Sequence, residues 1–258
     1  MLNTPSFRYK FCLAYDGGSF RGSQKQTHGG AVFNKVEAVF MKLFRRSIRC
    51  VPCGRTDSGV HARSMVFHAD FPFLLDEDLI VDRLNNHLRS SSLVIRSLCA
   101  VPSTFHALSS ASARFYDYFF TFDPILPHYL LSSVTLIKGE PVFIPSNNDL
   151  EMLFLGRRNM RKLSNHGSAK TTVKTMTHAS IKTMTYSGLF NDCFEIYRFR
   201  FGADGFLYRM MRHIVGLLLH CMMNFNSINT LRDCMCIHRN TRYSLAPCQG
   251  LHLSGVYY

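Results

Sequence analysis

The chain has 258 residues, of which 47% are hydrophobic and 18% are charged. This composition excludes a disordered polymer and is enough for one large domain or two small ones. Lysine and arginine outnumber aspartate and glutamate by 30 to 17, and the net charge of +13 predicts a polyanionic partner, with nucleic acid favoured.

In the first half of the chain, hydrophobic patterns predict four strands and two helices. The strands cover residues 8–15, 48–52, 64–70 and 93–101, and the helices cover residues 31–44 and 76–88. The second helix begins with three acidic residues, which the positive end of a helix dipole favours. The order is βαββαβ, which predicts a ferredoxin-like split unit.

The second half repeats this order. Strands are predicted over 113–122, 172–186, 193–201 and 250–258, and helices over 149–155 and 206–223. The basic and polar stretch 157–174 is predicted to be a loop. The fold class is therefore predicted to be α+β, with two ferredoxin-like (βαββαβ) units over 1–103 and 104–258.

One loop is suited to chemistry. Residues 54–62 read GRTDSGVHA and lie between two predicted strands. A Thr-Asp-Ser-Gly run by itself is an ordinary turn. Here Asp57 follows two residues after Arg55, and a carboxylate on a loop between core strands can act as a nucleophile or in acid–base chemistry if a cation keeps it ionised.

The strand that opens the second half carries a second candidate. Alternation places Arg114, Tyr116 and Tyr118 on one side, where aromatic rings beside an arginine suit stacking on an unpaired base. Packing of the tyrosines in the core is the alternative, and the spacing alone favours it.

The helix predicted over 206–223 is the third candidate. Gly205, Arg209, Arg212 and Gly216 share one of its faces. Arginines beside glycines indicate a face that another backbone or a ligand approaches closely. A solvated face is the alternative, but it needs no glycine.

Five blocks of sequence, in this order, carry a resemblance to a known family. They are YDGGSFRGSQKQ at 15–26, GRTDSGVHA at 54–62, FHALSSASARFYDY at 105–118, GADGFLYRMMRHIVGLLL at 202–219 and APCQGLHLSGVYY at 246–258. Together they resemble the tRNA pseudouridine synthase A family over the whole chain. The resemblance implies a pseudouridine synthase fold, with a continuous, mainly antiparallel sheet and a central basic cleft.

The resemblance also implies roles for individual residues. Asp57 matches the catalytic aspartate, Arg212 the arginine that pairs with it, and Tyr116 the tyrosine that stacks on the target base. Arg55 matches an arginine that helps to extrude the nucleotide, and Arg114 is a further candidate for substrate binding.

The implied reaction converts uridine to pseudouridine at nucleotides 38, 39 and 40 in the anticodon stem-loop of tRNAs. It breaks the bond between C1′ and N1, turns the uracil and rejoins it through C5. Asp57 either attacks the sugar or removes its 2′ proton, and both routes need the ionised carboxylate. The reaction is redox-neutral and transfers no phosphate, so no cofactor and no metal are expected.

Some positions depart from the family pattern. Ser23 stands where a tryptophan is usual, Met65 where a glutamine is usual, and Leu108 where an arginine is usual. Arg209 and Met210 stand where other, polar residues are commoner. These departures put substrate contacts in doubt more than chemistry, and they motivate an alternative, a catalytically lapsed tRNA- or RNA-binding protein of the same fold.

The nine cysteines are scattered, and no signal peptide or membrane span is predicted, so we expect reduced thiols in a cytoplasmic protein with no membrane partner. Cys50 and Cys53 have the first half of a zinc-knuckle spacing, but no second pair follows at a matching interval. The alternation of Cys234, Cys236 and His238 suits a strand or an irregular turn better, although a zinc-dependent nucleic-acid enzyme remains a minor alternative. The family resemblance implies a homodimer that binds one tRNA across both subunits.

Overall fold

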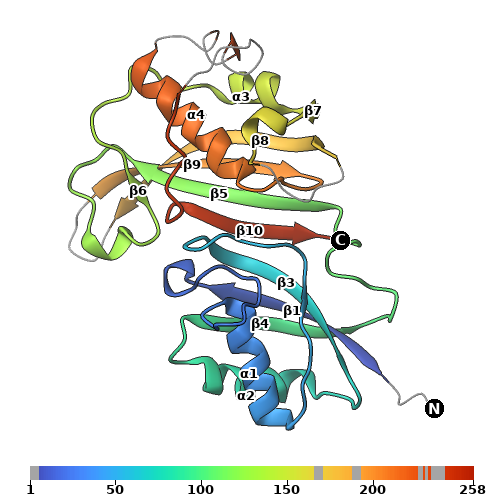
Figure 1. Ribbon diagram of the computed structural model, residues 1–258. Coiled ribbons are helices and arrows are strands. Elements are labelled where there is room, and N and C mark those ends of the chain that lie inside the picture. The colour runs from blue at the N-terminus through green and yellow to red at the C-terminus, as the bar shows by residue number, and fades with distance from the viewer. Residues whose placement is uncertain (1–5, 166–170, 188–192, 226–228, 230–231, 234–241) are drawn as a thin grey trace. The chain divides into compact units, whose positions relative to one another are not determined.

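The computed structural model describes residues 6–165, 171–187, 193–225, 229, 232–233 and 242–258 (Figure 1). The chain divides into two compact units. Unit 1 consists of Met1–Ser112 together with Leu253–Tyr258, and unit 2 consists of Ala113–His252. The structure thus differs from the predicted division at 103/104.

The difference at the boundary has a physical cause in hydrogen bonds made within unit 1. The backbone N–H of Ser112 donates to the carbonyl of Tyr257 over 2.8 Å, and the Tyr258 hydroxyl donates to the carbonyl of Ala107 over 2.8 Å. The Tyr258 ring also lies 4.8 Å from the ring of Phe105. The end of the chain and the segment that precedes Ala113 are therefore both held in unit 1.

Unit 1 contains four strands and two α-helices before the division. They are β1 (Phe7–Tyr15), α1 (Val32–Phe44), β2 (Val51–Pro52), β3 (His61–Phe71), α2 (Glu77–Leu88) and β4 (Leu93–Val101). The strand order is β4-β1-β3, with β2 paired to β3, and every one of these pairs is antiparallel. The predicted order of elements is confirmed, and β4 has the predicted bounds.

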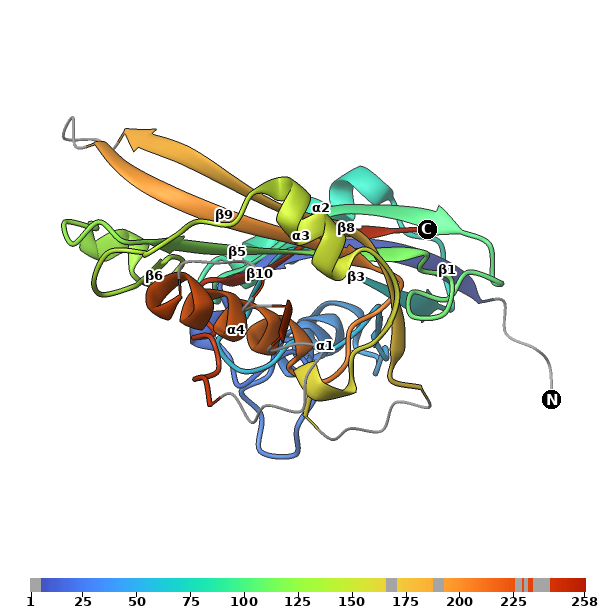
Figure 2. The same cartoon turned by 90° about the horizontal axis from the view of Figure 1, so that it is seen from above.

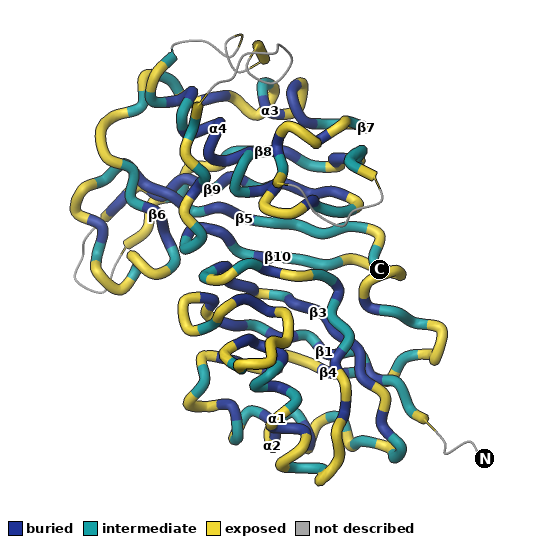
Figure 3. The backbone as a smooth tube through the Cα atoms, viewed as in Figure 1, coloured by how far each residue is buried: buried dark blue, intermediate teal, exposed yellow. Residues whose placement is uncertain are grey.

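The core of unit 1 follows from the alternation of residues along β1 (Figure 3). Tyr9, Phe11 and Leu13 are buried, while the residues between them are partly exposed. The Phe11 ring stacks on Phe67 of β3 at 4.7 Å and lies 5.7 Å from Phe40 of α1. An apolar strand face thus packs against the apolar stripe of a helix, and burial of these large rings is the main stabilising term.

Helix α2 begins as its acidic start predicts and covers the free edge of β4. The Asp76 carboxylate accepts the backbone N–H of Leu79 and caps the helix. Farther along α2, the Asn85 side chain makes two hydrogen bonds with the backbone of Ile95 in β4. Its Oδ1 accepts the Ile95 N–H over 2.8 Å, and its Nδ2 donates to the Ile95 carbonyl over 2.9 Å. These bonds satisfy edge groups that another chain could otherwise pair with.

The strands of unit 2 are also mainly antiparallel. Its elements are β5 (Ala113–Thr121), β6 (Thr135–Leu136), α3 (Asn147–Phe154), β7 (Gly156–Asn159), β8 (Val173–Ser187), β9 (Cys193–Ala203) and α4 (Met210–Asn224). The order is β5-β9-β8-β7, with β6 parallel to β5. The long β8–β9 pair can be followed in Figure 2. The last strand, β10 (Leu251–Tyr257), begins in unit 2 and ends in unit 1.

Two predictions for unit 2 were wrong. The stretch 157–174 is not all loop, because its start belongs to β7 and residues Arg161–Leu163 form a 3-10 turn. Helix α4 begins at Met210 rather than at residue 206, because Arg209 adopts a left-handed backbone with φ of 59°. Gly205 and Arg209 therefore precede the helix instead of lying on one of its faces.

Both units mix helices with mainly antiparallel strands, as the α+β prediction requires. The ferredoxin-like label and the central basic cleft stay predictions. None of the helices in the described part of the chain has both the length and the apolar character that crossing a bilayer needs.

Candidate active site

The loop that carries Asp57 joins β2 to β3 in unit 1 and is closed by short backbone hydrogen bonds. At its start, the Cys53 N–H donates to the carbonyl of Val66 over 2.8 Å. At its end, the Val60 N–H donates to the carbonyl of Asp57 over 3.2 Å, and Gly59 takes a φ of +78° that favours glycine. The predicted turn is thus present, with a half-buried Asp57 and an exposed Arg55.

A second segment, residues 15–23, supports this loop from beside it. The Tyr15 hydroxyl and the Thr56 Oγ1 are 2.8 Å apart, and the Ser58 hydroxyl donates to the carbonyl of Phe20 over 3.2 Å. A Cβ on Gly17 would overlap the carbonyl oxygen of Val60. The two segments are therefore in backbone contact, and the Asp-Gly-Gly turn after β1 is needed for that approach.

Unit 2 holds the tyrosine candidates on β5. Tyr116 is half-buried, lies opposite Phe201 of β9, and makes an edge-on contact with the Phe206 ring at 5.0 Å. Tyr118 is fully buried; its hydroxyl lies 2.8 Å from the Thr135 hydroxyl, and burial raises its pKa. Packing in the core thus accounts for Tyr118, whereas the Tyr116 ring is partly accessible to a ligand.

The Arg114 guanidinium, on the same strand, donates to the carbonyl of Asp204 over 2.9 Å. This bond joins the start of β5 to the end of β9. It limits the directions in which the half-buried Arg114 side chain can lie.

Arg212 lies in the first turns of α4 and is tied to a neighbouring segment. Its Nε donates to the carbonyl of Ala246 over 2.7 Å, and the Ala246 N–H donates to the carbonyl of Arg212 over 3.1 Å. One turn later, a Cβ on Gly216 would overlap the carbonyl oxygen of Ser244. The backbone of a second segment therefore lies against Gly216. The sequence had left open whether another backbone or a ligand approaches this face.

The structure places Asp57 and Arg55 in unit 1, and Arg114, Tyr116 and Arg212 in unit 2. Within unit 2, Tyr116 is on β5 and Arg212 is on α4. That Asp57 meets Tyr116 and Arg212 stays a prediction.

Comparison with known proteins places the chain in a family. A family model described as tRNA pseudouridine synthase matches residues 152–258. A tRNA pseudouridine synthase A from Methylacidiphilum infernorum is 31% identical over 275 residues, covering 100% of this chain and 98% of the relative. The chain belongs to the tRNA pseudouridine synthase A family. Members from Porphyromonas gingivalis and Protochlamydia amoebophila are 31% and 30% identical, with 97% of this chain covered in each case and 97% and 96% of those proteins.

The positions that depart from the pattern of the tRNA pseudouridine synthase A family differ in their surroundings. Ser23 is fully buried and bonds the loop of Asp57, and Met65 is fully buried beside the Cys53 sulfur at 3.6 Å. Leu108 is 50% exposed, and the Arg209 guanidinium lies over the ring of the exposed Tyr208. Ser23 and Met65 therefore support the fold around the loop, and Leu108 and Arg209 are the departures that a substrate can reach.

Sequence reasoning missed the residues that hold the Asp57 loop, above all Tyr15, Ser23 and Thr56. Tyr15 and Ser23 lie far from Thr56 along the chain, so no local pattern links them to it. The usable signal was the run of small residues after β1, because small residues permit close backbone approach.

Metal-site chemistry receives no support from the described part of the chain, in which no three histidine, cysteine, aspartate or glutamate side chains come together. Cys50 and Cys53 are buried, and burial raises the pKa of the Cys50 thiol. The cluster Cys234, Cys236 and His238 lies outside the described residues.

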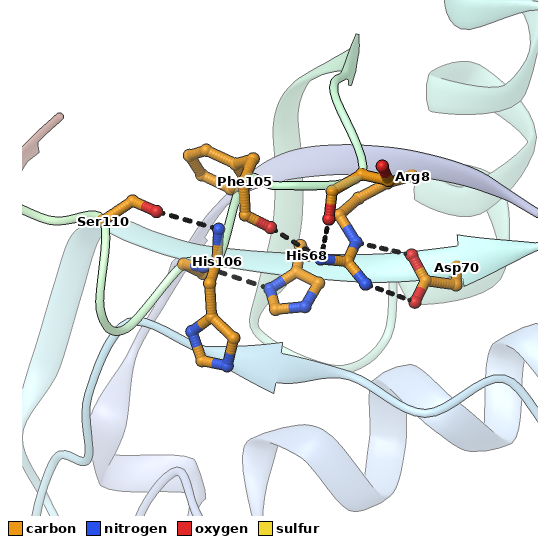
Figure 4. Close-up of polar contacts among 8 residues, drawn as sticks. Arg8, His68, Asp70, Phe105, His106 and Ser110 are labelled. Carbon is orange, nitrogen blue, oxygen red and sulfur yellow. Dashed lines mark hydrogen bonds and ion pairs between the residues drawn. The ribbon is translucent and has the colours of Figure 1, made fainter.

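The segment that leads from unit 1 to β5 contains the family block that begins at Phe105, and unit 1 holds it by a polar cluster (Figure 4). The Arg8 guanidinium bonds both Asp70 oxygens at 2.7 Å and donates to the carbonyls of Ser103 and Phe105. His68 Nδ1 accepts the Ala107 N–H over 3.1 Å. Burial and the nearby Arg8 lower the pKa of His68 to about 4, so the neutral ring that can accept this bond is the form present at neutral pH.

Proposed function

We propose that this chain isomerises uridine to pseudouridine in tRNA, at nucleotides 38 to 40 of the anticodon stem-loop. Family membership supports the reaction, since the relatives are tRNA pseudouridine synthases. The net charge of +13 supports a nucleic-acid substrate. The observation that carries the proposal is the closed, hydrogen-bonded loop that presents Asp57 between β2 and β3.

Asp57 is proposed as the catalytic carboxylate. The target nucleotide first leaves the base stack, at a cost of a few kcal/mol, and Arg55 assists this step. Tyr116 then stacks on the uracil, and Arg114 binds beside it. Arg212 keeps Asp57 ionised, as attack on the sugar or removal of its 2′ proton requires. The bond from C1′ to N1 breaks, the base turns, and a bond from C1′ to C5 forms. C5 loses its proton and N1 takes one up, so the product is an isomer of the substrate.

The proposed arrangement places the substrate in a basic cleft of a pseudouridine synthase fold, in which two ferredoxin-like units share one sheet. The strands of unit 1 lie in the order β4-β1-β3-β2. A ferredoxin-like unit has the same strand order, which supports the ferredoxin-like label. Two copies of the chain are proposed to act together on one tRNA, by analogy with the family.

The test is to incubate the purified chain with unmodified tRNA and to map pseudouridine chemically. We expect product at nucleotides 38 to 40 from the native chain and none from Asp57→Asn, which should still bind tRNA because binding depends on lysine and arginine contacts with phosphates. Asp78→Asn, at an exposed position in the first turn of α2, is the matched control and should retain full activity.

Three outcomes separate the alternatives. Salt-sensitive tRNA binding without product, even at high protein concentration, would indicate the catalytically lapsed RNA-binding protein, to which the exposed Leu108 points. Normal turnover by Asp57→Asn would show that another group is the catalytic one. Product at nucleotides other than 38 to 40 would retain the reaction and reject the proposed position.

A further inference from the structure

Thr56 immediately precedes Asp57, and both of its backbone polar groups bond a single residue, Ser23. The Thr56 N–H donates to the Ser23 hydroxyl oxygen over 2.8 Å, and the Ser23 N–H donates to the Thr56 carbonyl over 3.1 Å. Ser23 is 0% exposed and Thr56 is 7% exposed. Water therefore cannot replace these bonds without a rearrangement of the loop.

Ser23 is itself held by a helix. The first backbone N–H groups of α1 donate to the residues before it: Val32 to the carbonyl of Gly22 over 3.1 Å, and Phe33 to that of Ser23 over 3.3 Å. These carbonyls satisfy groups that a helix start leaves unpaired, which is consistent with the lack of a side-chain cap at Ala31. The position of Ser23 is thus determined by α1, a regular element of the core.

Little space remains between this segment and the loop. A Cβ on Gly22 would lie 3.0 Å from the Thr56 carbonyl oxygen and 3.5 Å from the Asp57 carbonyl carbon. Gly22 also has a φ of +87°, which side chains rarely adopt. From the other side, the Tyr15 hydroxyl bonds the Thr56 side chain. Thr56 is therefore fixed through both its backbone and its side chain.

We propose that Ser23 is a positioning residue for Asp57. Its hydroxyl fixes the peptide that joins Arg55 to Thr56, and this peptide sets the direction in which the Asp57 carboxylate leaves the loop. The inference rests on the proposed role of Asp57.

The test is a single-turnover measurement of pseudouridine formation at saturating protein, together with the dissociation constant for tRNA. Ser23→Ala leaves the buried Thr56 N–H without its acceptor, and we expect the rate constant to fall about 10-fold to 100-fold because small misplacements of reacting groups have effects of this size. The dissociation constant should stay within about twofold, since the loop peptide makes no phosphate contact in this proposal.

Ser146→Ala is the matched control. It removes the hydroxyl that caps α3, so it lowers stability without touching the Asp57 loop, and its rate constant should equal that of the native chain. Ser23→Cys is nearly the same shape but is a weak acceptor, so its rate constant should lie between those of the native chain and Ser23→Ala. If Ser23→Ala does not fold, the rate constant of Ser23→Cys is compared with that of the native chain instead.

The outcomes are distinct. A native rate constant in Ser23→Ala, or in Ser23→Cys where Ser23→Ala is unfolded, overturns the positioning role and leaves the proposed function intact. An equal fall in Ser146→Ala shows a general effect of stability and also overturns it. If the native chain makes no pseudouridine, the proposed function fails and the role of Ser23 fails with it.

Discussion

The two units each contain an arginine–aspartate pair between adjacent strands, and the comparison of the pairs is instructive. In unit 1, Arg8 of β1 faces Asp70 of β3, whereas in unit 2 the aspartate, Asp117, is on β5 and the arginine, Arg200, is on β9. Both pairs are bidentate, with N–O distances of 2.7 to 2.8 Å. The Asp70 side chain is 42% exposed and that of Asp117 only 7%.

Two ion pairs with the same geometry can therefore contribute differently to the free energy of unfolding. Water already solvates much of Asp70, so its pair with Arg8 contributes little to stability. Asp117 has lost nearly all of its water, and the two hydrogen bonds from Arg200 compensate its charge there. Arg8 also donates from Nη1 to the carbonyls of Ser103 and Phe105 in the segment before β5. The exposed pair therefore orients a connection as well as joining two strands.

The units also differ in how they hold the candidate functional residues. Asp57 is on a loop, and that loop needs hydrogen bonds from Tyr15, Ser23 and Phe20 to have one conformation. Tyr116 and Arg212 are on a strand and a helix, where the backbone is already fixed. A functional loop thus requires a second layer of polar contacts that a regular element does not.

The strongest test of this difference is the addition of one methyl group to a glycine in each unit. Gly17→Ala in unit 1 and Gly216→Ala in unit 2 would each drive a Cβ into a backbone carbonyl. We expect each to lower the free energy of unfolding by about 3 kcal/mol, measured by urea denaturation. Gly205→Ala, with only the end of the Lys174 side chain nearby, is the control and should change it by less than about 1 kcal/mol. If all three behaved alike, close backbone contact would not be the cause.

A smaller effect is expected from the two ion pairs. Asp117→Ala should lower the free energy of unfolding by about 2 kcal/mol, because it removes a carboxylate that is only 7% exposed and the two hydrogen bonds that it accepts from Arg200. Asp70→Ala should lower it by about 1 kcal/mol or less. Chemical denaturation at low and at high salt measures both, and salt should reduce the effect of Asp70→Ala more. Equal losses would contradict the argument from burial.

The smallest effect concerns pH and the cluster of Figure 4. The pKa of His68 is lowered to about 4 by burial, Arg8 and His106, against the opposing effect of Asp70. The folded state therefore binds fewer protons than the unfolded state between pH 6.5 and about 4, and stability falls as pH falls through this window. His68→Asn keeps an acceptor for the Ala107 N–H but does not titrate, so its stability should depend less on pH.

Urea midpoints at pH 7 and pH 5 measure this difference. The pKa values of His178 and His213 in unit 2 are also lowered by burial. They should produce the pH dependence that remains in His68→Asn. An unchanged pH dependence in that variant would assign the whole effect to unit 2.

Regular elements with a clear period were predictable from the sequence. Strand β4 has the predicted bounds, and α1 and α2 each start one residue later than predicted, since their apolar and acidic residues are spaced as helices require. The short strands β6 and β7 were missed because two to four residues contain no period. The start of α4 was misplaced because the left-handed backbone of Arg209 leaves no mark in composition.

In the candidate site too, local features were predictable from the sequence and long-range contacts were not. The Asp57 turn was predictable from its Thr-Asp-Ser-Gly sequence, which is local chemistry. Its bonds to Tyr15 and Ser23 were not, because they join residues that lie far apart in the chain and become neighbours only in the folded unit. Ser23 looked like a lost substrate contact, whereas its burial makes it part of the support of the loop.

The return of Leu253–Tyr258 to unit 1 has a consequence for synthesis on the ribosome. Translation at about 5–20 residues per second takes on the order of ten seconds to produce unit 2 after residue 112. During that time the nascent first unit lacks the strand that follows β3 in its order, while the second can begin to fold. Unit 1 is thus finished only after unit 2 has been made, and β3 is exposed to mispairing until residues 253–258 have been synthesised.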